Sequence, residues 1–207
     1  MGQVQGRPRS YGIWIVLAIV VIILIAVGST YNSLVTMDQA VQSQWAQVQN
    51  QYQRRADLVP NLVATVKGAA NFEKSTYIAV AQARASVGQL SPQAVANAAN
   101  DPKIMAQFSQ AQNNLGSALS RLLVTVENYP QLKATENFQT LQAQLEGTEN
   151  RISVERRRYN ELAQAFNTKR NTFPTVMIAG IFGSRFNDKA YFQAPAGAQT
   201  APQVNFP

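Results

Sequence analysis

The residues of this chain whose types and spacing could do chemistry are a few polar side chains in its middle. Arg55 stands where an apolar residue is expected in a stripe of three-four spacing, and Asp57 follows two residues later. Glu149 and Glu155 belong to a second such stretch, together with Thr148. Carboxylates gathered in a cleft can act as general acid and base. This buried polar layer is therefore a candidate ligand-binding or catalytic site.

A structural role for the same layer is the preferred interpretation. An unpaired buried guanidinium is costly, so Arg55 requires a carboxylate partner. Antiparallel alignment of the two helices places Glu149 opposite Arg55, while Glu155 lies about 9 Å farther along at about 1.5 Å per residue. Glu149 is thus the first expected partner and Glu155 the second, in a pair that fixes helix register. Two placements stay open for Asp57: bonding to backbone groups freed by Pro60, or facing solvent.

Cysteine and histidine are both absent from the 207 residues, and this excludes many functions. Thiol nucleophiles, disulfides, haem and iron–sulfur sites, zinc sites built on these residues and histidine-assisted serine hydrolases cannot form within one chain. Carboxylate, lysine, serine or tyrosine chemistry remains, as does a magnesium or calcium site made only of oxygens. We expect no enzyme, no cofactor and no metal.

An apolar run near the N-terminus predicts a membrane-spanning helix. Every residue from Ile13 to Val27 is apolar, and no charged residue lies between Arg9 and Asp38. A bilayer-spanning helix needs about 20 such residues, so residues 11–33 are expected to form a signal-anchor helix after a short flank, residues 1–10. Aromatic rings at its two ends are the expected interfacial anchors, namely Tyr11, Trp14 and Tyr31.

The processing and orientation of this helix follow from its flanks. Small residues around Gly28 leave a cleaved signal peptide as an alternative. Arg7 and Arg9 precede the helix, and no Lys or Arg lies between Thr30 and Gln53, so the N-terminus is predicted to be cytoplasmic and the domain extracytoplasmic.

Periodic apolar residues predict an all-α domain, an antiparallel four-helix bundle of long helices over residues 34–193. The first helix continues from the anchor through Val66, with a kink near Ala56 caused by Pro60. Further helices are expected at 71–87, from 103 to residues 128–130, where Pro130 ends the third one, and from 136 until Pro174 closes the last one. Between the second and third, residues 91–102 are expected to form a loop or a weak extra turn.

The C-terminal part differs in composition from the bundle. Residues 173–192 mix aromatic residues with glycine and proline, and residues 194–207 are expected to be disordered. Because the fourth helix returns toward the membrane, its basic end and the aromatic segment could form a second membrane contact. The equal alternative is that the apolar side chains of this segment cap the end of the bundle, namely Phe173, Ile178, Phe182 and Phe192. The candidate membrane-surface residues are Arg158, Lys169, Arg170, Phe173, Phe182 and Arg185.

Several separate motifs in this chain resemble the LemA family. They are YNSLV at 31–35, QYQRRADLVPNLVATVKG at 51–68, ENYPQLKA at 127–134 and LEGTENRISVERRRYN at 145–160. The resemblance implies a membrane-anchored four-helix domain of bacterial type, in the inner membrane, whose activity is poorly defined. One branch of the family is associated with forming magnetosome membranes, which implies a role in shaping membranes.

The function expected from these features is a membrane-anchored helical scaffold that self-associates or binds protein partners and organises the bilayer. A ligand-binding accessory or sensor module is the alternative, and an enzyme using Asp57, Glu149 or Glu155 is a third. The formal charge is +7, and apart from Arg7 and Arg9 the chain carries 16 basic against 11 acidic residues. Such a dilute excess suits an anionic membrane and does not predict nucleic-acid binding.

Overall fold

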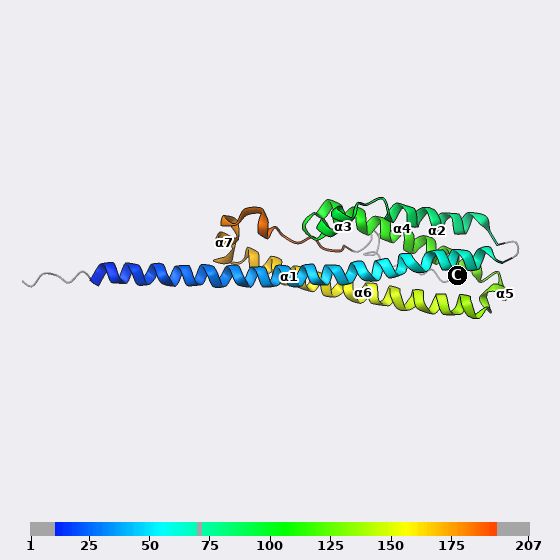
Figure 1. Cartoon of the computed structure of the whole chain (residues 1–207), viewed down its shortest axis with the longest axis horizontal. Helices are drawn as coiled ribbons and strands as arrows, with labels where there is room; N and C mark the ends of the chain where they lie inside the picture. Colours follow the sequence, from blue (N-terminus) through cyan, green and yellow to red (C-terminus); the bar gives the residue numbers. More distant parts are fainter. Residues whose placement is uncertain (1–10, 70–71, 194–207) are drawn as a thin grey trace, which may run out of the picture.

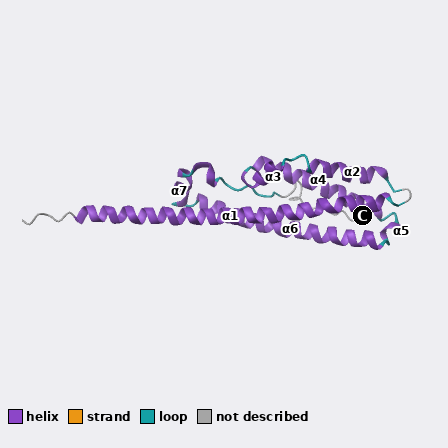
Figure 2. Ribbon diagram, in the orientation of Figure 1, coloured by secondary structure: helices purple, strands orange, loops and turns teal. Residues whose placement is uncertain are grey.

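The computed structural model of the protein describes residues 11–69 and 72–193, and all regular structure in these ranges is helical (Figure 2). The all-α prediction and the long apolar N-terminal helix are confirmed. The predicted flank, residues 1–10 with Arg7 and Arg9, and the predicted tail, residues 194–207, lie outside the described residues.

Helix α1 runs from Tyr11 to Lys67, so the apolar N-terminal run and the first bundle helix are one continuous element (Figure 1). Its 57 residues correspond to about 86 Å at the helical rise of about 1.5 Å per residue. The N-terminal part projects past the other helices, and its large apolar side chains from Tyr11 to Ile25 are exposed. This helix is long and apolar enough to cross a membrane.

Beyond the projecting part, α1 buries residues at spacings that alternate between four and three. An average spacing of 3.5 residues is the coiled-coil period, which keeps one seam of the helix against its neighbour over its whole length. Two members of the seam are charged. The buried residues are Leu34, Asp38, Val41, Trp45, Val48, Tyr52, Arg55, Val59, Leu62 and Val66.

Proline 60 does not end α1, although it lacks the N–H that the carbonyl of Ala56 would normally accept. The side chain of Arg84 in α2 replaces this donor, since its Nε donates to the Ala56 carbonyl oxygen at 3.1 Å. A neighbouring helix thus satisfies the backbone group that the proline frees.

The next elements form a helical hairpin on one side of α1. Helix α2 spans Lys74–Val87, and α4 spans Pro102–Val126 and packs along α2. Between them α3 (Pro92–Asn97) and the short 3₁₀ helix η1 (Ala98–Asn100) occupy the segment expected as a loop or weak turn. The extra-turn alternative was therefore the better one, because Ser91 and Asp101 cap the starts of α3 and α4 with their side chains.

Helix α6 returns along α1 toward its N-terminal half. It spans Glu136–Asn171, after the single turn α5 (Pro130–Lys133), and the Thr135 side chain caps its start. Figure 1 shows α6 antiparallel to α1 on one side and the α2–α4 hairpin on the other. Helices α1 and α4 run away from the projecting end of α1, and α2 and α6 run toward it (Figure 1).

The last described segment turns back over the bundle. Helix α7 (Thr175–Ile181) and the 3₁₀ helix η2 (Gly183–Phe186) lie beside α1 at the end where the apolar part projects (Figure 1). Residues 187–193 then run without helical structure along α6. We refer to residues 187–193 as the C-terminal strap.

Buried apolar side chains of the described residues form two clusters. The membrane-proximal cluster includes Trp45, Phe108 and Tyr159, and the distal cluster includes Leu62, Leu122 and Phe138. On α1 the first cluster ends at Tyr52 and the second begins at Val59, so Arg55 lies between them. The polar layer predicted from the sequence therefore divides the core.

Candidate functional site

Arg55 is the centre of the buried polar layer. Its Nη1 donates to Glu149 Oε1 at 2.9 Å, so the salt bridge is made with Glu149, the first of the two expected partners. Its Nη2 donates to the backbone oxygen of Gln112 at 2.8 Å and to the side-chain oxygen of the same residue at 2.5 Å. The Arg55 side chain is 4% exposed and that of Glu149 43%, so one end of the pair reaches water.

Two residues around Arg55 were missed by the sequence analysis. Gln112 is buried in α4 within a seam spaced like that of α1, and this spacing was the signal that could have identified it. The ring of Tyr52 lies 5.1 Å from the Arg55 guanidinium carbon. Burial raises the pKa of the Tyr52 phenol, and the nearby charges of Arg156 and Arg55 oppose that rise.

The other residues assigned to the polar layer do not join Arg55. Asp57 is exposed on the solvent side of α1, two residues past the seam, and accepts from Gln53 Nε2 at 2.7 Å. Of its two expected placements it takes the one that faces solvent, so its grouping with the buried layer was wrong. Thr148 is buried, and its hydroxyl donates to the Gln144 carbonyl of its own helix at 2.7 Å. Glu155 makes separate contacts elsewhere.

Glu155 lies between α6 and α1, closer to the membrane-proximal end. Its carboxylate accepts from Gln44 Nε2 at 2.5 Å and pairs with Arg158 at 3.2 Å. The three acidic candidates thus contact three different sets of residues and do not face a common cleft. Within residues 11–69 and 72–193, no group of three or more acidic side chains is arranged to hold a metal ion.

A second buried ion pair joins the C-terminal strap to α1. The ammonium group of Lys189 donates to the carboxylate of Asp38, and also to Asn100 Oδ1 at 2.7 Å. It lies 4.9 Å from the centre of the Phe166 ring. This pair was not predicted from the sequence, although Asp38 falls in the same three-four register as Leu34 and could have been identified as a seam residue.

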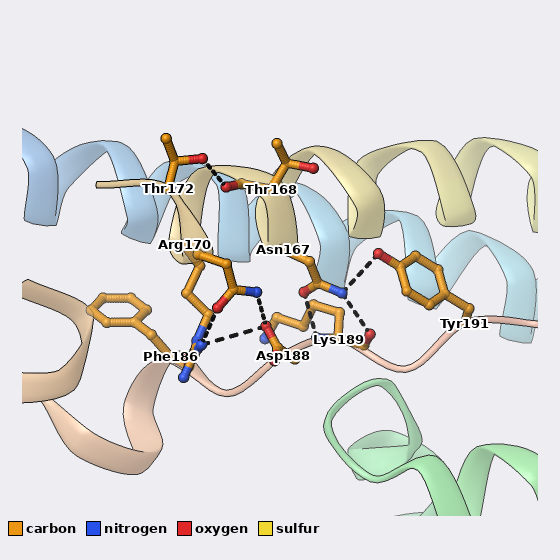
Figure 3. A network of polar contacts seen from close by, with 9 residues as sticks. Asn167, Thr168, Arg170, Thr172, Phe186, Asp188, Lys189 and Tyr191 are labelled. Carbon is orange, nitrogen blue, oxygen red and sulfur yellow. Dashed lines mark hydrogen bonds and ion pairs between the residues drawn. The ribbon is translucent and has the colours of Figure 1, made fainter. Parts of the chain in front are cut away.

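Two asparagine side chains of α6 hold the strap by its backbone, and Figure 3 shows the contacts of one of them, Asn167. Asn167 accepts from the Lys189 amide at 2.7 Å and donates to the Lys189 carbonyl at 2.9 Å. Asn160 makes the same paired contact with Phe192, with both distances 2.9 Å. Asn160 and Asn167 are seven helical residues apart, and the strap residues that they bind are three extended residues apart. Both spacings correspond to about 10 Å, so asparagines two helical turns apart can bind the strap backbone in the same way.

Tyr159, the residue directly before Asn160, is enclosed by the strap. The Tyr159 hydroxyl donates to the Ala190 carbonyl at 2.8 Å, and the Ala190 amide donates to the Ala99 carbonyl at 2.9 Å. Burial raises the pKa of the Tyr159 phenol well above its ordinary value of 10.0.

The basic end of α6 is only partly available to a membrane. Lys169 is exposed. Arg170 is held by the protein, because it donates to the Phe186 carbonyl and pairs with Asp188 at 3.6 Å (Figure 3). Arg158 lies about 18 Å from Arg170 along the helix and pairs with Glu155, so the structure does not bring it to the others.

The aromatic segment is divided between the core and the surface. Phe186 and Phe192 are buried, as capping of the bundle requires, whereas Phe173 and Phe182 are exposed. Arg185 is exposed, and its guanidinium carbon lies 5.9 Å from the centre of the Tyr31 ring.

The predicted interfacial anchors fall into different surroundings. Tyr11 and Trp14 are exposed on the projecting part of α1. Tyr31 is partly buried at the edge of the bundle, where its ring centre lies 4.7 Å from that of Phe182 and 5.6 Å from that of Phe186.

Comparison with known proteins gives the family. The LemA family pattern matches residues 44–206, more than three quarters of the chain. The chain belongs to the LemA family. Its relatives include the magnetosome proteins MamQ 1 and MamQ 2 of Paramagnetospirillum magneticum and MamQ of Magnetospirillum gryphiswaldense. Each is 28% identical over 216 residues, which cover 94% of this chain and 79% of the relative.

In this LemA chain the motifs that carry the resemblance supply several of the contacts described above. Arg55 and Pro60 lie in the motif of α1, and Glu149, Tyr159 and Asn160 lie in the motif of α6. Their contacts fix the helices and the strap to one another. The membrane association of the chain rests on the apolar part of α1.

Proposed function

We propose that this chain is a membrane-anchored scaffold that associates with further copies of itself beside the bilayer and organises it. One observation carries the proposal: α1 is a single helix that extends from the apolar, uncovered segment into the buried seam of the bundle. No reaction is part of the proposed function.

The continuity of α1 supports lateral association. The 20 residues from Tyr11 to Thr30 span about 30 Å, the thickness of the hydrocarbon core of a bilayer. A helix without a break then holds every bundle at the same height and tilt. Confinement to a plane with a common orientation raises the effective concentration of facing surfaces, so weak lateral contacts suffice for assembly.

The relatives support the membrane-organising part of the proposal. Proteins named as magnetosome proteins are similar to this chain over 94% of its length, so the similarity includes the anchor and the bundle. Arg7 and Arg9 before the anchor favour a cytoplasmic N-terminus and an extracytoplasmic bundle, which would assemble on the outer face of the inner membrane.

The test is energy transfer between copies in vesicles, with light scattering in detergent as a second measurement. The chain contains no cysteine, so Val124→Cys on the exposed side of α4 gives a single labelling site. Donor-labelled and acceptor-labelled chains are mixed and reconstituted at decreasing protein-to-lipid ratios. We expect transfer above the random level that persists on dilution. Transfer that falls to the random level, together with a monomeric mass in detergent, contradicts self-association.

A hollow at the membrane-distal tip favours the second candidate, a ligand-binding accessory module. It encloses about 650 Å³ between the end of α1 and the α4–α5 connection, within the usual size range of small-molecule sites. Ala64 lines it, so Ala64→Trp fills it. A ligand bound there raises the melting temperature of the wild type and leaves that of the filled variant unchanged.

A further inference from the structure

The outer face of α7 is apolar although no part of the described chain covers it. Met177 and Ile181 are four residues apart in α7 and are 64% and 77% exposed. Residues at this spacing share one side of a helix. On the opposite side Ile178 and Ala179 are buried against the bundle. Phe173, two residues before the helix begins, is 76% exposed and adds a further apolar side chain. We refer to Phe173, Met177 and Ile181 as the apolar stripe.

The stripe lies at the height where α1 leaves the bundle. Phe182, directly after α7, has its ring 4.7 Å from that of Tyr31, and Tyr31 follows the uncovered 20 residues of α1. Figure 1 shows α7 beside α1 at this end, far from the tip formed by α2, α4 and α5. When the uncovered part spans the hydrocarbon core, α7 is at the headgroup boundary.

The charges around α7 are positive. Between residues 169 and 187 the charged residues are Lys169, Arg170 and Arg185, and Asp188, the next one, pairs with Arg170. Lys169 and Arg185 are exposed. Basic groups beside an apolar helical face are typical of helices that lie in the plane of an anionic membrane surface.

We propose that Phe173 and α7 insert into the headgroup–acyl boundary of the leaflet from which α1 emerges, and so form a second, in-plane contact with lipid. The contact deepens the proposed function, since it rests on the anchoring of α1 in the bilayer and is independent of self-association. It occupies one leaflet beside a spanning helix, so each copy acts as an asymmetric wedge.

The test measures quenching of a fluorophore by lipids that carry a quencher on the acyl chain. Single cysteines are placed in the full chain at Met177 or Ile181, labelled with an environment-sensitive dye, and reconstituted in vesicles of phosphatidylcholine and phosphatidylglycerol. Val124→Cys is the matched control, because Val124 is 69% exposed and lies on the distal part of α4. Leu17→Cys, on the uncovered part of α1, reports the anchor itself.

We expect labels at 177 and 181 to be quenched several-fold more than the label at 124, and the label at 17 to be quenched strongly. Quenching at 181 equal to that at 124, with Leu17 still quenched, overturns the insertion of α7 and leaves the anchor intact. A label at 181 that is shielded from water but unquenched by lipid identifies a protein occupant and also overturns it. Loss of quenching at 17 contradicts the anchor, and with it both proposals.

A charge variant checks that the stripe causes the insertion. Met177→Glu combined with Ile181→Glu places carboxylates on an exposed face, so the melting temperature is expected to stay that of the wild type. A dye on Phe173→Cys in this background should lose its quenching by at least several-fold. Retained quenching contradicts the proposal. Lys169→Gln with Arg185→Gln should reduce the quenching only in vesicles that contain the anionic lipid.

Discussion

At the residue scale, the contact that most constrains the bundle is the one made by Arg55. A buried guanidinium is tolerated here because Gln112 supplies two acceptors from α4 and Glu149 supplies a carboxylate from α6. If any of the three helices shifted along its axis by one heptad, the contacts of Arg55 with Gln112 and Glu149 would be lost. The layer between the two apolar clusters therefore selects one register, whereas the apolar seams alone accept several.

Gln112→Leu is expected to destabilise the protein by roughly 2–3 kcal/mol, because the buried guanidinium loses its side-chain acceptor. Glu149→Gln should cost about 1 kcal/mol or less, since that carboxylate is partly solvated. Adding Arg55→Met to Gln112→Leu should recover most of the loss, because the buried guanidinium that lacks its side-chain acceptor is removed. Chemical unfolding in detergent, followed by circular dichroism, measures all of these values. Wild-type stability in Gln112→Leu contradicts the proposed role.

Burial of the Tyr159 phenol is expected to make the folding stability of the protein decrease at alkaline pH. The folded-state pKa of Tyr159 is raised by burial, so the phenol of the unfolded chain ionises first, near the ordinary value of 10.0. Stabilisation from the buried neutral phenol is therefore complete below about pH 10 and declines as the pH rises further. Tyr159→Phe should lose about 1 kcal/mol at neutral pH, through the Ala190 hydrogen bond, and should show a shallower decline above pH 10. Denaturant titrations between pH 7 and 11 measure both effects; equal slopes contradict the prediction.

At the element scale, α1 keeps its continuity through Pro60 because α2 supplies the missing donor. The Arg84 contact with the Ala56 carbonyl joins two helices at the position where α1 is intrinsically weakest. Continuity of α1 thus depends on tertiary structure as well as on its own sequence.

A double-mutant cycle tests this dependence. Arg84→Met should cost about 1 kcal/mol in the wild type and close to nothing with Pro60→Ala, because the new backbone amide at position 60 then donates to the Ala56 carbonyl. Unfolding free energies of the four proteins give the coupling. Arg151→Met, at an exposed position on α6, is the matched control and should cost the same in both backgrounds. Equal costs for Arg84→Met in the two backgrounds would falsify the donor role.

The position of the C-terminal strap, like the continuity of α1, depends on residues far away in the sequence. The strap follows α6 by the backbone contacts of Asn160 and Asn167, and its one buried cation, Lys189, reaches Asp38 on α1. The strap therefore links both long helices at the membrane-proximal end, next to α7.

At the scale of the whole molecule, the projecting apolar part of α1 and the exposed side chains of α7 lie toward the same end, and the bundle extends from there along α1 and α6 (Figure 1). The lipid contact proposed for α7 would lie at a shallower depth than the spanning helix. Together the two contacts would restrict the tilt of the bundle more than the anchor alone, which suits the proposed scaffold.

The orientation of the chain across the membrane is tested with a membrane-impermeant maleimide. Val124→Cys in intact spheroplasts should be labelled, and Gln3→Cys, before the anchor, should be labelled only after lysis, because Arg7 and Arg9 favour retention of the N-terminal side in the cytoplasm. The reverse pattern establishes the opposite topology. Labelling of both positions after lysis controls for reactivity.

Much of the fold could be predicted from the sequence because it depends on local periodicity. An uncharged apolar run determines the projecting part of α1, and three-four spacing determines α1, α4 and α6 with ends close to those observed. The Arg55–Glu149 pair was also predictable, since antiparallel helices with a fixed rise place a given pair of residues at one level.

Only the tertiary structure decided the remaining contacts, because they join segments far apart in the chain whose meeting no local pattern encodes. Gln112 and Asp38 fit their seams as well as apolar residues do, and only their neighbours across the core show what they bind. The aromatic segment had two equal interpretations. The structure supports each interpretation for a different part of the segment. Phe186 and Phe192 are buried in the core beside α6, whereas the apolar stripe at α7 is exposed.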